Sequence, residues 1–578
     1  MPQRIIKALY LVFLKLGQSL KRFPESLILI AAAAVLLIDK NHLGFVSTHM
    51  KENFPKLPMV LVMGFLIFLC IRALKELDIL ISNNLKSIVW LLGLVFLTVY
   101  FFVLLPDLKT ISIIRFLAVC VALLVSFLFI PYVKRNSQGF EMYIMKLIIG
   151  LLVTYLYSGV LYLGLIAILF TVDQLFVLHI SGKLYFDLWI ITAGIFAPAY
   201  FLGGVPEKGA QLDENSYSKV LKILFLYIVM PILSIYTLIL YAYFAKVLVT
   251  EQWPQGMVSN LVLWYSFIAA AIIFLIRPLT DKNLWTYRFS KIMPVAIIPL
   301  LFMCFWAMGI RIRNYGITES RYYVLVGALW VLFVFVYWII KGGSRNVVLP
   351  VSIAIIAILT IAGPQSAFSI SLKSQTARLS SIFTKNNMSA DGKLAEGKAD
   401  ISDEDKEEIS SILRYLENTH GLEKVRILPS DFTLDNAKNY LGFDLKDYGV
   451  SYAKKYYSYS VKSIKPVDIS GYRFYANIRA NNSKTEVANN FKVEYKSLSG
   501  ILNILQNNNI IYTKNIKDFI VNLPKNESKQ AELDINQLTF SDSQNGTEVL
   551  FIFRSLSFEE DSSGTDTIND ADFSIFIK

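Results

Sequence analysis

Cysteine, histidine and charge are all scarce in this 578-residue chain. It has three cysteines and four histidines, and Asp, Glu, Lys and Arg together make up 17% of its residues, against about 25% in a typical soluble protein. Cys70, Cys120 and Cys304 each lie inside an apolar stretch. This distribution excludes a disulfide-stapled secreted fold and a thiolate metal site in the C-terminal part, and we interpret all three as small packing residues.

Apolar residues are abundant instead, at 55% of the chain. Apolar runs near the roughly 20 residues that a bilayer requires recur between Ser26 and Gly363. Nothing comparable follows Lys373. The sequence therefore predicts an all-α polytopic membrane bundle followed by a soluble α+β domain.

Hydropathy divides the bundle into about eleven transmembrane helices, and a count of ten or twelve stays open because the first two runs are short. The runs lie at 24–38, 57–71, 86–105, 111–130, 147–172, 184–202, 220–245, 257–276, 292–310, 322–340 and 346–363. The predicted domains are an amphipathic N-terminal segment at 1–22, the bundle at 23–372, a linker at 373–400 and the soluble domain at 401–578.

Charge predicts the orientation. On alternate sides of the eleven runs, Lys and Arg number twenty on the side of the N-terminus and ten on the other. The positive-inside rule then places the N-terminal segment in the cytoplasm and the C-terminal domain outside it, across a bacterial cytoplasmic membrane. Residues 1–372 hold 30 Lys and Arg against 15 Asp and Glu, whereas residues 373–578 hold 26 against 29. The net charge of +12 thus indicates contact with membrane lipids and not with nucleic acid.

In the C-terminal part, Ser402 followed by three acidic residues predicts the start of a helix that ends near Gly421, and a short second helix is expected near 434–441. Alternation then changes to a period of two around Phe474, Val549 and Phe573, which indicates half-buried strands. A helix is expected at 499–506. His420 stands beside no Cys, His or acidic pair in the sequence, so we expect no metal site and no cofactor.

Several segments resemble the bacterial multi-pass proteins grouped as domain of unknown function 4153. The resemblance is carried by Arg22-Phe23-Pro24, Tyr241-Ala-Tyr243, Trp253-Pro254, the block from Asn314 to Tyr322, the stretch from Gly363 to Ser369, and the run from Ile409 to Leu416 ending at His420-Gly421. It implies the bacterial cytoplasmic membrane and many helices before a soluble tail. It implies no reaction.

The densest polar group near the membrane is the connection after residue 310, on the face predicted to be outside. Its candidate binding residues are Arg311, Arg313, Glu319, Arg321 and Tyr322, with Trp253 on the same predicted side. Three arginines on a face that normally avoids positive charge need a reason. Guanidinium groups bind phosphate or carboxylate in a fork, and Glu319 would orient one of them, which predicts an anion or lipid-headgroup site. The alternative is a salt-bridged turn that docks the tail.

Two function classes stay open. The first is a non-enzymatic envelope protein, transporter-like or a sensor, whose outer domain binds an anionic ligand or an envelope protein. The second is a lipid-dependent transferase at the outer leaflet, for which Glu319 and Asp107 are the better-placed acidic residues. Glu76 and Asp78 have the acid-x-acid spacing of a metal-holding pair, but they fall on the predicted cytoplasmic side, where a charged inner loop is the favoured interpretation. No catalytic triad signature or phosphate-binding loop is present, so the non-enzymatic interpretation is favoured. Catalytic residues and the oligomeric state are not predicted.

Overall fold

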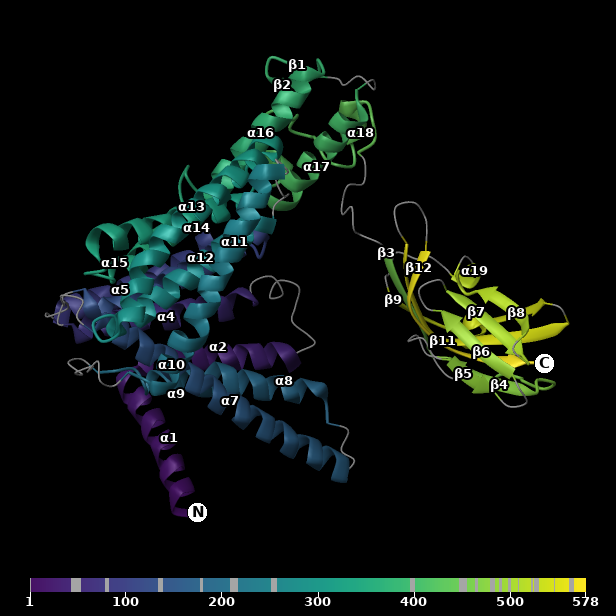
Figure 1. Ribbon diagram of the computed structural model, residues 1–578, viewed down its shortest axis with the longest axis horizontal. Helices are drawn as coiled ribbons and strands as arrows, with labels where there is room; N and C mark the ends of the chain where they lie inside the picture. Colours follow the sequence, from purple (N-terminus) through teal and green to yellow (C-terminus); the bar gives the residue numbers. More distant parts are fainter. Residues whose placement is uncertain are drawn as a thin grey trace. The chain divides into compact units, whose positions relative to one another are not determined.

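The computed structural model divides the chain into two compact units (Figure 1). One comprises Met1–Gly397 and Tyr415–Thr433, and the other comprises Lys398–Arg414 and Leu434–Lys578. The residues that the structure describes are 2–42, 54–77, 83–133, 139–176, 180–207, 217–250, 257–395, 401–445, 455–462, 466–478, 484–487, 491–496, 500–507, 509–520, 523, 530–544, 546–560 and 566–578.

The first unit is built of helices. They are α1 (Pro2–Arg22), α2 (Pro24–His42), α4 (Lys56–Glu76), α5 (Asn83–Val99), η1 (Tyr100–Leu104), α6 (Thr110–Phe129), η2 (Ile130–Tyr132), α7 (Phe140–Phe176), α8 (Gly182–Ile190), η3 (Ile191–Phe196), α9 (Ala197–Leu202), α10 (Lys219–Ile223), η5 (Leu224–Val229), α11 (Met230–Thr250), α12 (Met257–Ile276), η6 (Arg277–Leu279), α13 (Leu284–Tyr315), α14 (Glu319–Lys341), α15 (Val348–Leu359) and α16 (Ala367–Lys385).

Nine helices among the described residues are long and apolar enough to cross a membrane. Each coincides with one of the eleven predicted runs. The other two runs are also helical, as α2 and α15, but α15 has only 12 residues, a length of about 18 Å against a hydrocarbon core of about 30 Å. The polytopic α-helical bundle is therefore confirmed, and the count of about eleven is supported loosely.

The largest core cluster of the first unit lies among α11, α12, α13 and α14, where Met230, Ile276, Leu300 and Val334 are fully buried. A second cluster forms around Phe23, Phe140 and Leu202. The first cluster packs α13 against α14, and the candidate site lies in the connection between these two helices.

Most described residues of the predicted linker at 373–400 belong to regular elements. Residues up to Lys385 continue α16, and the chain then forms a short hairpin, β1 (Ser389–Ala390) with β2 (Lys393–Leu394). The polar composition from Asn386 to Asp400 predicted a flexible boundary, whereas α16 before it buries Phe368, Leu379 and Phe383. With Ser371, Gln375 and Ile382, which are also buried, they recur every three or four positions along the helix, a pattern of one buried face.

The second unit contains most of α17 (Asp403–Thr419), α18 (Ala437–Leu441), α19 (Lys517–Ile520), η8 (Ile535–Leu538) and two sheets. The strands are β3 (Lys455–Val461), β4 (Phe474–Ile478), β5 (Lys484–Val487), β6 (Phe491–Lys496), β7 (Ile501–Gln506), β8 (Asn509–Asn515), β9 (Gln530–Leu533), β10 (Thr539–Gln544), β11 (Thr547–Glu560) and β12 (Asp566–Ile577). One sheet has the order β4-β12-β11-β3-β9, with β10 also on β11, and the other has the order β5-β6-β7-β8. All pairs are antiparallel except β3 with β9.

Aromatic side chains from both sheets fill the core between them. Phe573 on β12 lies 4.9 Å from Phe553 and 5.5 Å from Tyr495 of the other sheet, measured between ring centroids. The predicted strands around Phe474, Val549 and Phe573 are confirmed, as are the predicted helices, which appear as α17 and α18. The α+β class of the C-terminal part is thus confirmed.

The helix expected at 499–506 is wrong, because residues 501–506 form the strand β7. Leu502 and Ile504 alternate with more exposed neighbours and are fully buried, so packing between the sheets overrides the helix propensity of leucine. The missed signal is the asparagine run after Gln506. Asn507 has φ +50° at the end of β7, a conformation that asparagine adopts more readily than most residues.

Candidate functional site

The connection from α13 to α14 is clamped against α16. Gln375 Nε2 donates to the carbonyl oxygens of Tyr315 at 3.0 Å and Ile317 at 3.2 Å, and the Ser374 hydroxyl accepts from the Ile317 N–H at 2.9 Å. Gly316 has φ +67°, and a Cβ there would lie 2.7 Å from Gln375 Nε2. The tight approach of α16 thus requires glycine at this turn.

A Gly316→Ala substitution should therefore lower stability by about 1–2 kcal/mol, because alanine is strained at positive φ and displaces the Gln375 side chain. Gly309→Ala is the matched control, since a Cβ at Gly309 on the same helix meets nothing within 4 Å. Alanine there should be neutral or stabilising. Thermal unfolding of the detergent-solubilised protein, followed by tryptophan fluorescence, compares the two. Equal melting temperatures would contradict the clamp.

Glu319, the first residue of α14, accepts hydrogen bonds from three side chains. The Ser371 hydroxyl donates to Oε1 at 2.5 Å and the Tyr415 hydroxyl donates to Oε2 at 2.5 Å. His420 Nε2 lies 3.0 Å from Oε1, and its side chain is only 2% exposed. A carboxylate that is 12% exposed and has three such partners joins the start of α14 to α16 and to the segment from Tyr415 to His420. We call these four side chains the Glu319 junction.

Tyr415 stays a donor in this junction. Burial raises the pKa of its phenol well above the ordinary value, and the hydrogen bond to the Glu319 carboxylate raises it further, because both disfavour a phenolate beside a carboxylate. The hydroxyl therefore remains protonated at neutral pH and continues to bind Glu319.

The junction contains Ser, His and Glu but lacks the geometry of a catalytic triad. In a triad, one imidazole nitrogen faces the serine and the other faces the acid. Here His420 Nε2 faces both, lying 3.1 Å from Ser371 Oγ and 3.0 Å from Glu319 Oε1. Ser371 is also fully buried and donates directly to the carboxylate. The arrangement binds two parts of the chain together and does not activate a nucleophile.

Arg321 turns back onto the connection. Its NH1 group donates to the carbonyl oxygens of Tyr315 at 2.9 Å and Gly316 at 2.7 Å. The guanidinium carbons of Arg321 and Arg378 lie 5.5 and 5.7 Å from the centroid of the Tyr315 ring, within the range of a cation–π contact. Arg321 thus closes the turn and has less freedom to bind a ligand than the sequence suggested.

The other predicted binding residues do not form one cluster. Arg313 is exposed and Arg311 is half-buried, and no carboxylate within the described ranges forms an ion pair with either. The Tyr322 hydroxyl donates to the Gln365 carbonyl at 2.7 Å, which fixes the turn before α16. Trp253 and its neighbour Pro254 lie outside the described residues. The structure therefore brings Glu319, Arg321 and Tyr322 into one clamped region.

The prediction that Glu319 orients an arginine is wrong, because its carboxylate is occupied by His420, Ser371 and Tyr415. Sequence reasoning missed these three partners. A signal existed for two of them, since Tyr415 and His420 both lie in the segments that carried the family resemblance. For Ser371 and Gln375 there was none beyond their place on the buried face of α16.

Of the acid-x-acid pair Glu76 and Asp78, the structure describes only Glu76. Glu76 at the end of α4 binds Arg22, whose Nε and NH2 groups each lie 2.8 Å from a carboxylate oxygen. Arg22 also donates to the carbonyl oxygens of Val205 and Pro206. Asp78 lies outside the described residues. Within the part of the chain that the structure describes, no three His, Cys, Asp or Glu side chains form a group able to hold a metal ion.

A family model described as Domain of unknown function (DUF4153) matches residues 26–371. The chain belongs to the DUF4153 family. The DUF4153 match contains Glu319, Arg321 and Ser371, while Tyr415 and His420 lie beyond its end. The chain is also similar to a protein of Pasteurella multocida (strain Pm70), itself described as uncharacterized, with 26% identity over 183 residues. That match covers 30% of this chain and 31% of the relative. No solved structure matches.

Proposed function

We propose that this DUF4153 protein is a non-enzymatic sensor-type protein of the bacterial cytoplasmic membrane, whose extracytoplasmic domain binds a ligand or partner. The observation that carries the proposal is the Glu319 junction. Its carboxylate accepts hydrogen bonds from three side chains of the protein itself, so this acidic residue of the predicted outer face holds segments of the chain together and supports a role in communication more than in catalysis.

The course of the chain supports this proposal. The chain leaves the second unit at Arg414, contributes Tyr415–Thr433 to the first unit and re-enters the second at Leu434. Tyr415 and His420 bind Glu319 at the start of a helix able to span the membrane. A conformational change that a ligand causes in the second unit is therefore transmitted through the continuous chain to the segment Tyr415–Thr433, which binds α14. Such coupling needs a differential affinity of the ligand for two arrangements of that segment.

Arg311 and Arg313 suggest the chemistry of the ligand. They add two positive charges beside the clamped turn, and neither has a carboxylate partner within the described residues. An anionic ligand, a lipid headgroup or an acidic surface of an envelope protein would complement them. Nucleic acid is not among the partners that we propose.

The orientation is tested by cysteine labelling in a variant whose three native cysteines are replaced by alanine. A cysteine at exposed Asp391, in the turn between β1 and β2, should react with an impermeant maleimide in intact spheroplasts. A cysteine at exposed Asp281, before α13, should react only after lysis. The matched positions lie on opposite sides of the predicted topology. The reverse labelling pattern would overturn the proposed orientation.

The function class is tested by comparing envelope lipids and glycans of a deletion strain, its parent, and the deletion strain carrying Ser371→Ala. The proposal expects unchanged lipid and glycan structures in all three strains. If the deletion strain has a phenotype, the Ser371→Ala variant should rescue it less well than the wild-type protein does, at normal protein abundance. The reason is that one of the three donors to Glu319 is lost. A missing lipid or glycan modification in the deletion strain would instead favour a lipid-dependent transferase.

A further inference from the structure

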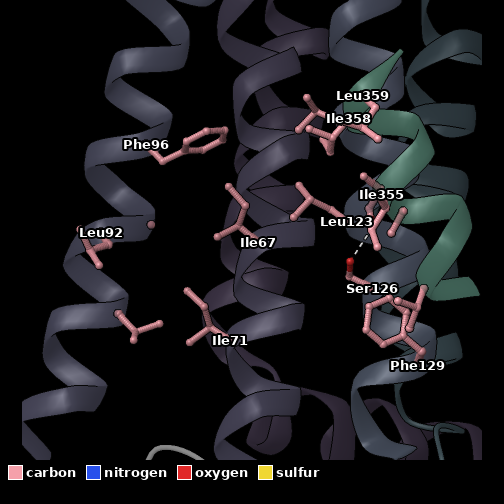
Figure 2. A pocket seen from close by; sticks show the side chains of 16 residues that line it. Ile67, Ile71, Leu92, Phe96, Leu123, Ser126, Phe129, Ile355, Ile358 and Leu359 are labelled. Atoms are coloured by element: carbon pink, nitrogen blue, oxygen red, sulfur yellow. Dashed lines mark hydrogen bonds between the residues drawn. The ribbon is translucent and has the colours of Figure 1, made fainter. Parts of the chain in front are cut away.

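A second feature of the bundle is an apolar groove of about 760 Å³ between α5 and α15. Figure 2 shows Phe96 of α5 and Ile355 of α15 on its two sides, with Ile67 of α4 and Leu123 of α6 between them. Ser126 is the one hydroxyl-bearing residue of its lining, and that hydroxyl donates to the Ala122 carbonyl of its own helix at 2.7 Å. The groove therefore offers apolar surface and no free polar group.

The groove lies between the apolar helix α15 and three helices able to span a membrane, α4, α5 and α6, so its natural solvent is lipid. A volume of this size is within the range of small-molecule sites, about 300–1,000 Å³. Left empty, its walls would lose dispersion contacts, which are the main attraction available in a bilayer. An acyl chain fills such a space. The chain alone gives little preference for one lipid, because every bilayer lipid supplies similar tails.

A cation near one end of the groove supplies that preference. Arg115 lies four residues before Val119 on α6, so it occupies the same helical stripe as the groove lining, one turn away. Its guanidinium carbon is 5.5 Å from the ring of Phe368, the second residue of α16. This places it near the end of the groove where α15 stops. Arg115 is exposed, and it forms no ion pair with a described carboxylate.

We propose that this groove binds a phospholipid with an anionic headgroup, with one acyl chain along α5 and α15 and the phosphate on Arg115. Guanidinium groups bind phosphate through a planar fork of donors, which a membrane-level arginine without an acidic partner is free to offer. The site is independent of the sensor proposal. It lies on other helices and uses no residue of the Glu319 junction.

The test uses the full-length protein in detergent micelles, titrated with dioleoyl phosphatidylglycerol or dioleoyl phosphatidylcholine. Bound lipid is counted by native mass spectrometry, and melting is followed by tryptophan fluorescence. We expect about tenfold tighter binding of phosphatidylglycerol, the preference that one charge-assisted contact gives. Arg115→Gln should reduce phosphatidylglycerol to the affinity of phosphatidylcholine. Lys86→Gln is the control. Lys86 lies near the start of α5, at the end of the groove opposite to Arg115, so this variant should keep the preference for phosphatidylglycerol.

Ile355→Trp tests whether the groove binds the acyl chain of the lipid. Ile355 lines the groove and is 54% exposed, so a larger side chain fills the groove without displacing a core residue, and binding of both lipids should fall. Ile340→Trp on α14 is the control, because Ile340 is 70% exposed and is not part of the lining. Should Ile355→Trp fail to fold, Leu92→Trp, from the α5 wall, replaces it.

Three outcomes would overturn the proposal. The first is equal affinity of the wild-type protein for the two lipids. The second is an undiminished phosphatidylglycerol preference in Arg115→Gln. The third is wild-type lipid binding in the groove-filling variant. Inorganic phosphate distinguishes a free anion from a lipid headgroup. If phosphate alone raised the melting temperature as much as phosphatidylglycerol, the site would be an anion site without a role for the groove.

Discussion

Glu319→Ala is expected to release the segment from Tyr415 to His420 and to destabilise the first unit by about 3–5 kcal/mol, the usual effect of removing one partner from a buried charged group. The substitution removes the acceptor of the Tyr415 hydroxyl and of the His420 imidazole, whereas the Ser371 hydroxyl keeps the Phe368 carbonyl at 3.2 Å as a second acceptor. Unsatisfied buried donors cost about 1–3 kcal/mol each, less when they share one site. Limited proteolysis between residues 386 and 433 and melting of the purified protein measure the two effects.

Two variants frame this result. Glu423→Ala removes a carboxylate that is 69% exposed and should change stability by less than about 0.5 kcal/mol. Tyr415→Phe removes one donor and should cost about 1–2 kcal/mol. In the double variant with Glu319→Ala, the cost of Tyr415→Phe should largely disappear, since the two groups are directly coupled. Additive effects would mean that the hydrogen bond contributes nothing to the junction.

Much of the membrane unit was predictable because a bilayer imposes one simple rule on sequence. A helix that crosses it must be apolar for about 20 residues, so α5, α6 and α12 stand out from their hydropathy alone. The rule fails where the length of a helix differs from the length needed to cross the bilayer. α15 is apolar throughout yet only 12 residues long, and α7 is a single helix of 37 residues of which the sequence predicted only 147–172.

The candidate site was predictable in part for a different reason. Positive charge on the face predicted to lie outside identified Arg311, Arg313, Glu319 and Arg321 as candidates. The partners of Glu319, however, lie 52 and 96 residues away, at Ser371 and Tyr415. No local pattern encodes pairing over such distances. Hydropathy and charge thus locate a site on one element, whereas its chemistry depends on which other elements pack against it.

The sheets of the second unit provide the other large expected effect. Phe573→Ala should destabilise that unit by about 3–5 kcal/mol, because it removes a fully buried ring and leaves a cavity between the sheets. Phe573 packs on Phe553 and Tyr495, so strands from both sheets lose a shared contact. All eight tryptophans lie in the first 338 residues, so tryptophan fluorescence does not report on this unit. Amide hydrogen exchange of peptides from β11 and β12 is the appropriate measurement.

Phe576→Ala is the matched control, since Phe576 lies on the opposite face of the same strand and contacts Tyr475, which is 53% exposed. Removing a half-buried ring should cost only about 1 kcal/mol. Exchange in β11 and β12 should therefore accelerate strongly in Phe573→Ala and little in Phe576→Ala, while melting of the first unit, followed by tryptophan fluorescence, stays near the wild-type value in both. Equal acceleration by the two substitutions would mean that the sheets do not enclose a common core. Early melting of the first unit in Phe573→Ala would mean that the bundle depends on the sheet unit for its own stability, so that strain in the tail reaches α14 through folding and not through the Glu319 junction.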